Sequence, residues 1–317
     1  SLPSDDRGWI FYPLAALFSF SLAQWPVFFS AWGSCWLLLP VFLRTGMLLP
    51  DTRLGFLGLT VCLAACSVAA SLTLAAGFAF WAAFPFYLWL RGRLPARPFT
   101  GSHKLAAGIW LAGTTLCLAV LSDVFNSGSD YETTTNFLER DADSQLLMLA
   151  WCLENPHRAA GFMVALLGSS ASHVTALIPG LANDRAAVSV AVISGGISVA
   201  LFALTLRQVF RPDRNPDLLK RLAPWVGIAM VEIVMAVLVT VGRGGGYTLY
   251  RALSPHYGMV GLQFQFAAFV GAYLLWQDPA AGPVLKRWLR GLAVAASLLV
   301  IAQAAGQVRL LADVSEN

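Results

Sequence analysis

Charged residues are scarce in this chain of 317 residues: 12% are Asp, Glu, Lys or Arg, whereas 57% are hydrophobic. A soluble domain carries about 25% charged residues, so this composition excludes an ordinary soluble enzyme or binding domain. No nucleic-acid-binding motif is present, and we expect no nucleic-acid partner. The sequence therefore indicates a polytopic membrane protein.

Cysteine and histidine are scarce too, at five and four residues. The cysteines lie mostly inside apolar runs without metal-ligand spacing, and the histidines lack spaced acidic partners. Cys62 and Cys66 lie one helical turn apart, yet no nearby residue would complete a site. We therefore expect neither a metal centre nor a cofactor.

Long apolar runs dominate the chain instead. They predict membrane spans at 9–23, 33–49, 54–75, 78–90, 105–123, 186–206, 222–241, 259–276 and 291–308. No internal repeat or linker divides the sequence. We expect a single integral membrane domain over residues 1–317, folded as an all-α bundle of about nine transmembrane helices.

The placement of basic residues predicts the topology of these spans. Arg91–Lys104 holds four basic residues and no acid, and Arg207–Arg221 holds five against two acids, so both segments are expected inside. Three apolar runs lie between these two basic segments. Two segments on the same side of a membrane must be separated by an even number of crossings, so one of the three runs does not cross. We therefore expect Gly161–Gly180, which contains several serines and Pro179, to be a re-entrant or interfacial segment on the outer side.

This arrangement places the N-terminus inside and the C-terminus outside. Fifteen of the 21 basic residues then fall at the inner face and six at the outer face, as the positive-inside rule requires. The segment 124–185, which is more polar than the rest of the chain, becomes an outer-face segment. Most of the unusual polar residues are therefore expected on the outer side.

The stretch Arg243–Gly258 connects two of the spans and carries two arginines, three tyrosines, a histidine and three consecutive glycines. Arg243 and Arg251 have planar heads with several donors, which suit phosphate or carboxylate. Glycines let a backbone approach a ligand closely. Arginines and tyrosines at the end of a span are also ordinary interfacial anchors. The sequence leaves both interpretations open, an anion-binding loop and an anchoring loop.

Glu232 lies in the middle of the span 222–241. An ionisable group at that depth is costly and faces the bundle interior or a cavity. It predicts either a proton-coupling site or a neutral carboxyl that braces helices by hydrogen bonds. Gln263 and Gln265 in the next span, and Gln303 in the last, are its expected partners in the second case.

Four short motifs follow one another along the chain. They are Ser21-Leu22-Ala23-Gln24-Trp25, the small-residue run Ala69–Gly77 leading to Trp81 and Pro85, Gly168-Ser169-Ser170, and Val241-Gly242-Arg243 followed by Arg251-Ala252-Leu253-Ser254-Pro255-His256-Tyr257. In this order they resemble a group of bacterial polytopic inner-membrane proteins linked to surface polysaccharide or glycolipid assembly. That group is similar in turn to the polytopic glycosyltransferases that use lipid-linked sugars (the GT-C class).

The resemblance implies a multi-pass protein of the bacterial inner membrane that binds a polyprenyl-phosphate-linked sugar in an outward cavity. It implies a substrate-binding set made of Arg243, Tyr250, Arg251, His256 and Tyr257, together with Gln24 and Trp25. The family usually has Ser and Arg where this chain has Pro255 and His256, which puts one cationic position in doubt. His256 can still donate a hydrogen bond or carry a charge.

Sugar transfer needs a general base for the acceptor hydroxyl, and Asp123 at the end of a predicted span is the expected residue. Members of the family typically have a preceding section with acidic and histidine-containing motifs, which is not found in this sequence. A partner protein or a further section would then be required. Two alternatives stay open: a lipid or saccharide translocator that uses Glu232, and a non-catalytic membrane subunit that scaffolds another chain.

Overall fold

The computed structural model describes residues 41–43, 45–47, 55–73, 75–92, 103–127, 149–177, 183–211, 215–243, 249–254, 257–279, 282–291, 294–295, 298, 301 and 305. Every named element in this part of the chain is a helix. The predicted all-α fold is therefore confirmed for the described residues. The predicted span 9–23, with Gln24 and Trp25 after it, lies outside them.

Among the described residues, three helices are long and apolar enough to cross a membrane: α9 (Asp184–Val209), α10 (Pro216–Arg243) and α11 (Gly258–Gln277). Three further helices, α4 (Phe56–Thr73), α5 (Ala79–Gly92) and α6 (His103–Ser127), carry shorter apolar stretches. These six coincide with six of the predicted spans. As predicted, the described part of the chain has the helices of a membrane protein, while the total of nine spans stays a prediction.

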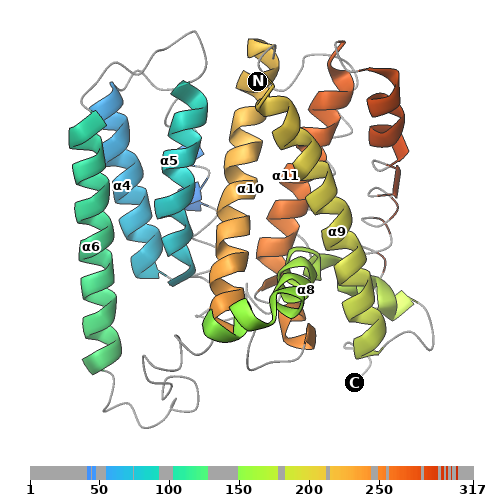
Figure 1. Cartoon of the computed structure of the whole chain (residues 1–317), viewed down its shortest axis with the longest axis horizontal. Coiled ribbons are helices and arrows are strands. Elements are labelled where there is room, and N and C mark those ends of the chain that lie inside the picture. Colours follow the sequence, from blue (N-terminus) through green and yellow to red (C-terminus); the bar gives the residue numbers. More distant parts are fainter. Residues whose placement is uncertain are drawn as a thin grey trace.

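Helix α10 lies at the centre of the bundle, between α5 on one side and α11 on the other (Figure 1). Helix α9 packs against α11, and α4 packs against α6 at the opposite edge. Helices that are separated along the sequence, such as α5 and α10, therefore pack side by side in the bundle. Because α10 and α11 are apolar around most of their circumference, both can be enclosed by other helices.

Helix direction gives the bundle two distinct ends. α5 and α9 finish, and α6 and α10 begin, at the end drawn uppermost in Figure 1. These helix ends flank both basic segments, Arg91–Lys104 and Arg207–Arg221, and we call this the basic end. α6 and α10 finish, and α9 and α11 begin, at the opposite end, which we call the loop end.

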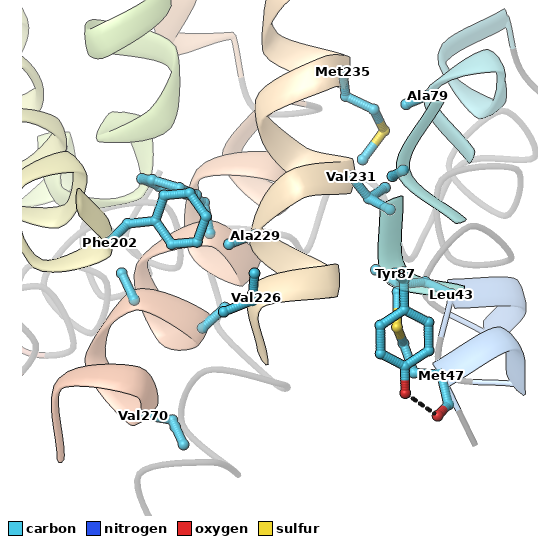
Figure 2. Packing of buried hydrophobic residues seen from close by; sticks show 14 of the residues in the cluster. Leu43, Met47, Ala79, Tyr87, Phe202, Val226, Ala229, Val231, Met235 and Val270 are labelled. Carbon is cyan, nitrogen blue, oxygen red and sulfur yellow. Dashed lines mark hydrogen bonds between the residues drawn. The ribbon is translucent and has the colours of Figure 1, made fainter. Parts of the chain in front are cut away.

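The core between the helices is aliphatic and aromatic. Phe202 of α9 meets Phe264 of α11 edge to face, with ring centroids 5.8 Å apart. Figure 2 shows Tyr87 of α5, fully buried, donating its hydroxyl to the carbonyl oxygen of Met47 over 2.9 Å. A buried phenol needs such an acceptor, and this bond fixes α5 to the helical residues 45–47.

Candidate functional site

A broken helix lies at the loop end. Helix α8 (Pro156–Leu167) ends at Gly168 and is followed by the 3-10 segment η6 (Ser169–Leu177). Twelve α-helical residues rise only about 18 Å, which is less than the thickness of a bilayer core. The segment 161–180, predicted to be re-entrant or interfacial, thus begins inside a short helix that breaks at Gly168 and continues as a 3-10 helix.

The break is possible because two glycines let backbones touch. A Cβ atom at Gly168 would collide with the carbonyl oxygen of Ala191 in α9, and one at Gly195 would collide with the carbonyl oxygen of Val164 in α8. Both collisions involve backbone atoms, which cannot rotate away. The two positions therefore hold α8 and α9 at a separation that only glycine allows.

The residues after the break form a buried hydrogen-bonded cluster with α11. Ser170 Oγ donates to Oε1 of Gln265 over 3.0 Å, and Gln265 Nε2 donates to the carbonyl oxygen of Leu167 over 3.1 Å. Ser169 Oγ bonds to the carbonyl oxygen of Tyr257 over 3.4 Å. The last carbonyls of a helix lack intrahelical donors, so the Gln265 amide satisfies one of those at the end of α8.

The 3-10 helix η7 (Leu249–Leu253) packs against α8, α9 and η6 at this same end. Its Ala252 is fully buried and anchors it, while Tyr250 and Arg251 are exposed. A Cβ atom at Gly161 of α8 would stand 3.8 Å from Cδ2 of Leu249, so the two elements are in van der Waals contact. Arg251 is thus presented to the exterior by a helix whose opposite side is packed.

The other predicted site residues are distributed as follows. Arg243 is the last residue of α10 and Asp123 lies near the end of α6, both at the loop end, with side chains outside the described part. Tyr257 is 4% exposed and packs in the core, so its contacts are with the bundle. His256, Gln24 and Trp25 lie outside the described residues. The structure therefore brings Tyr250, Arg251 and the end of α10 to one end of the bundle.

Glu232 is completely buried, and neither carboxyl oxygen has a hydrogen-bond partner among the described residues. Figure 2 shows Val231 and Met235 on the side of α10 that faces Ala79 of α5, and Ala229 on the side toward α11. Helical spacing places Glu232 between these two sides. The expected bonds from Gln263 and Gln265 are absent, and Gln265 is bonded to η6 and α8 instead. Gln303, the third expected partner, lies outside the described residues.

Sequence reasoning missed the role of Gln265 and overlooked Ser170 as its partner. Gly168-Ser169-Ser170 was recognised as a motif, and a polar Gln265 inside an apolar span is the matching signal, because polar groups in a membrane helix seek partners. The described residues contain no cluster of three or more His, Cys, Asp or Glu side chains that could hold a metal ion.

The geometry is compatible with two kinds of chemistry. The exposed guanidinium of Arg251 at the loop end can bind an anion. The buried carboxyl of Glu232, which has no hydrogen-bond partner among the described residues, can take up or release a proton. Neither a family model, nor a curated protein, nor a solved structure matches this chain.

Proposed function

We propose that this protein is a membrane-embedded, glycosyltransferase-like protein that binds a polyprenyl-phosphate-linked saccharide at the loop end of its bundle. The supporting observation is the docking of η7, which holds exposed Arg251 and Tyr250 over α8 and α9, at the end where α10 finishes with Arg243. Two arginines on elements at the same end of the bundle suit a lipid phosphate, because each guanidinium can bond two of its oxygens.

In this proposal the arginines stabilise the negative charge that develops on the leaving phosphate during sugar transfer. Asp123 stays the proposed base for the acceptor hydroxyl. Its helix α6 finishes at the loop end but packs against α4, at the edge of the bundle away from α8 and α9 (Figure 1), so the acceptor would have to lie between that edge and the arginines. Tyr250 adds an exposed aromatic ring that can lie against a sugar. The sugar-nucleotide chemistry that loads the lipid would belong to another protein.

The proposed topology has nine spans in the bacterial inner membrane, with the loop end outside. Two features support it. Helices α6 and α9 finish and begin at the same end, which agrees with a segment between them that does not cross. The basic segments flank helix ends at the opposite end, where the positive-inside rule places the cytoplasm.

The decisive experiment measures binding of a polyprenyl phosphate to the purified protein in detergent or nanodiscs. Losing a charge-assisted hydrogen bond costs about 1.5–3 kcal/mol, so Arg251→Ala should weaken binding about 10- to 150-fold. Arg251→Lys keeps the positive charge but loses the planar guanidinium that can bond two phosphate oxygens at once, so it should recover part of the affinity. Arg211→Ala removes an exposed arginine at the basic end and is the matched control.

An interfacial anchor gives a different result. Lysine would then replace Arg251 without loss, and Arg251→Ala would lower the yield of folded protein while leaving lipid affinity unchanged. Equal polyprenyl phosphate affinity in Arg251→Ala, Arg211→Ala and the parent, at matched amounts of folded protein, would reject the lipid-phosphate site.

A second candidate function, lipid or saccharide translocation, is favoured by Glu232. A buried carboxyl without a partner in a membrane helix is a common feature of proton-coupled transporters. Proton-driven uptake of a lipid-linked saccharide into proteoliposomes would support this function. Transfer of sugar to an acceptor without any dependence on a proton gradient would support the first.

A further inference from the structure

A pocket of about 270 Å³ lies beside α11, remote from the loop end. Phe269, Tyr273 and Trp276 line it from α11, and Leu289, Arg290, Val294 and Leu298 line its other side. The aromatic residues occupy the half of α11 that finishes at the basic end (Figure 1). The pocket therefore belongs to the side wall of the bundle near the basic end, and it is distinct from the proposed lipid-phosphate site.

The lining of this pocket is aliphatic or aromatic with one exception, Arg290. Arg290 is exposed and has neither a hydrogen bond nor an ion pair with any described residue. The residue before it, Leu289, is buried at 1% exposure and fixes this stretch of helix to the core. An arginine at an apolar pocket, with no ion pair to a described residue, can bind the headgroup of an anion that carries apolar chains.

The pocket opens toward the surroundings of the bundle. Val294 and Leu298 line it and are still 56% and 63% exposed, so their free faces would meet lipid in a membrane. Tyr273 and Trp276 pack with ring centroids 6.0 Å apart, and amphipathic rings of this kind mark the interface between acyl chains and headgroups.

We propose that this pocket binds an anionic phospholipid of the surrounding bilayer, with an acyl chain between α11 and the side chains of Val294 and Leu298 and the phosphate on Arg290. The volume is below the about 300–1,000 Å³ of pockets that enclose a whole small ligand, which suits one segment of a chain whose remainder stays in the bilayer. A second copy of this protein is a poorer occupant, because it would bring another basic end, with Arg211, Lys220 and Arg287, against Arg290.

The test is native mass spectrometry of the purified full chain with phosphatidylglycerol or phosphatidylcholine of equal chain length. The parent should retain phosphatidylglycerol in preference to phosphatidylcholine. Arg290→Gln should weaken phosphatidylglycerol binding about tenfold or more and leave phosphatidylcholine unchanged, since only the charged contact is lost. Val294→Trp fills the mouth of the pocket from an exposed position, and it should reduce retention of both lipids.

Two control variants separate the pocket from general charge and bulk. Arg287→Gln removes an exposed arginine three residues away, and Val284→Trp adds the same bulk at a position that is 68% exposed and does not line the pocket. Both should retain lipid like the parent. Should Arg290→Gln misfold, Arg290→Lys keeps the charge and should bind phosphatidylglycerol with intermediate affinity.

Three results would overturn the proposal. The first is equal phosphatidylglycerol retention in the parent and Arg290→Gln. The second is an equal loss in the controls, which would mean that the positive surface as a whole attracts the lipid. The third is a parent dimer in light scattering that Val294→Trp separates into monomers, which would make a second copy the occupant.

Discussion

Ser170 in η6 and Gln265 in α11 are 95 positions apart in the chain and meet through a 3.0 Å hydrogen bond inside the bundle. The same amide donates to the carbonyl oxygen of Leu167 at the end of α8. The Gln265 side chain therefore caps the end of α8 and joins α8 and η6 to α11, a helix long enough to cross a membrane. The position of α8 and η6, and with them of η7, depends on this junction.

Replacing Gln265 by leucine should destabilise the loop end. Leucine is similar in size but leaves the Leu167 carbonyl without its donor and Ser170 without its acceptor, and interhelical bonds of this kind contribute about 0.6–2 kcal/mol each. We expect a lower Tm in detergent for Gln265→Leu. Gln263→Leu on the same helix is the control, because Gln263 has no hydrogen bond to any described residue. An equal loss of Tm in both variants would show that the junction is not special.

Adding one methyl group should separate α8 from α9. Gly195→Ala puts a Cβ against the carbonyl oxygen of Val164, and overpacking of this kind costs about 1–3 kcal/mol. Gly196→Ala, one residue later on the exposed side of α9, has nothing within 4 Å and should be neutral or slightly stabilising. Thermal unfolding and protease sensitivity near residues 168–177 check the pair; similar behaviour of both variants would contradict the tight contact.

Much of the fold follows from apolar runs alone. The predicted spans 186–206, 222–241 and 259–276 each lie inside a helix, α9, α10 and α11. The helices are longer than the runs because polar residues at a membrane surface continue a helix without interrupting its backbone bonds. Glu232 was placed in the interior for a physical reason, the cost of a carboxyl among lipid chains, and its complete burial confirms that expectation.

Partners across the bundle could not be read from the sequence. Gln263 and Gln265 lie two residues apart, which puts them about 200° apart around a helix, so only one can face a given neighbour. The sequence does not tell which one, because the rotation of α11 depends on how Gly261 and Gly271 approach the backbone near Leu166 and the side chain of Thr205. Gln265 consequently bonds to Ser170, and Glu232 has no hydrogen-bond partner among the described residues.

The proposed topology predicts thiol labelling in a variant that lacks the native cysteines. Cysteines introduced at Ser129 and Asn183 should react with an impermeant maleimide added to intact spheroplasts, because both precede or follow helices at the loop end. A cysteine at Asn215, beside the start of α10 at the basic end, should react only after permeabilisation. Protection of Asn183 together with labelling of Ser129 would mean that Gly161–Gly180 crosses the membrane, and the nine-span topology would fail.

Two substitutions of Glu232 test whether its carboxyl has only a structural role or takes part in proton transfer. A buried polar group without a partner costs about 1–3 kcal/mol, so Glu232→Met, an apolar side chain of similar length, should raise the Tm. Glu232→Gln keeps the shape and stays neutral at every pH, so the fold should persist while any step that needs a proton on this carboxyl is lost. Glu154→Gln, at an exposed carboxyl, is the control for both. Thermal unfolding, and saccharide transfer or uptake measured with and without a proton gradient, provide the readouts.

A lower Tm in Glu232→Met would reveal a bracing hydrogen bond to a residue outside the described part, and activity in Glu232→Gln equal to the parent would exclude proton coupling. The proposed glycosyltransferase-like function predicts a higher Tm in Glu232→Met and saccharide transfer in Glu232→Gln equal to the parent, because sugar transfer to an acceptor needs no proton gradient across the membrane. Lost activity in Glu232→Gln would instead favour the translocator, in which the buried carboxyl carries a proton.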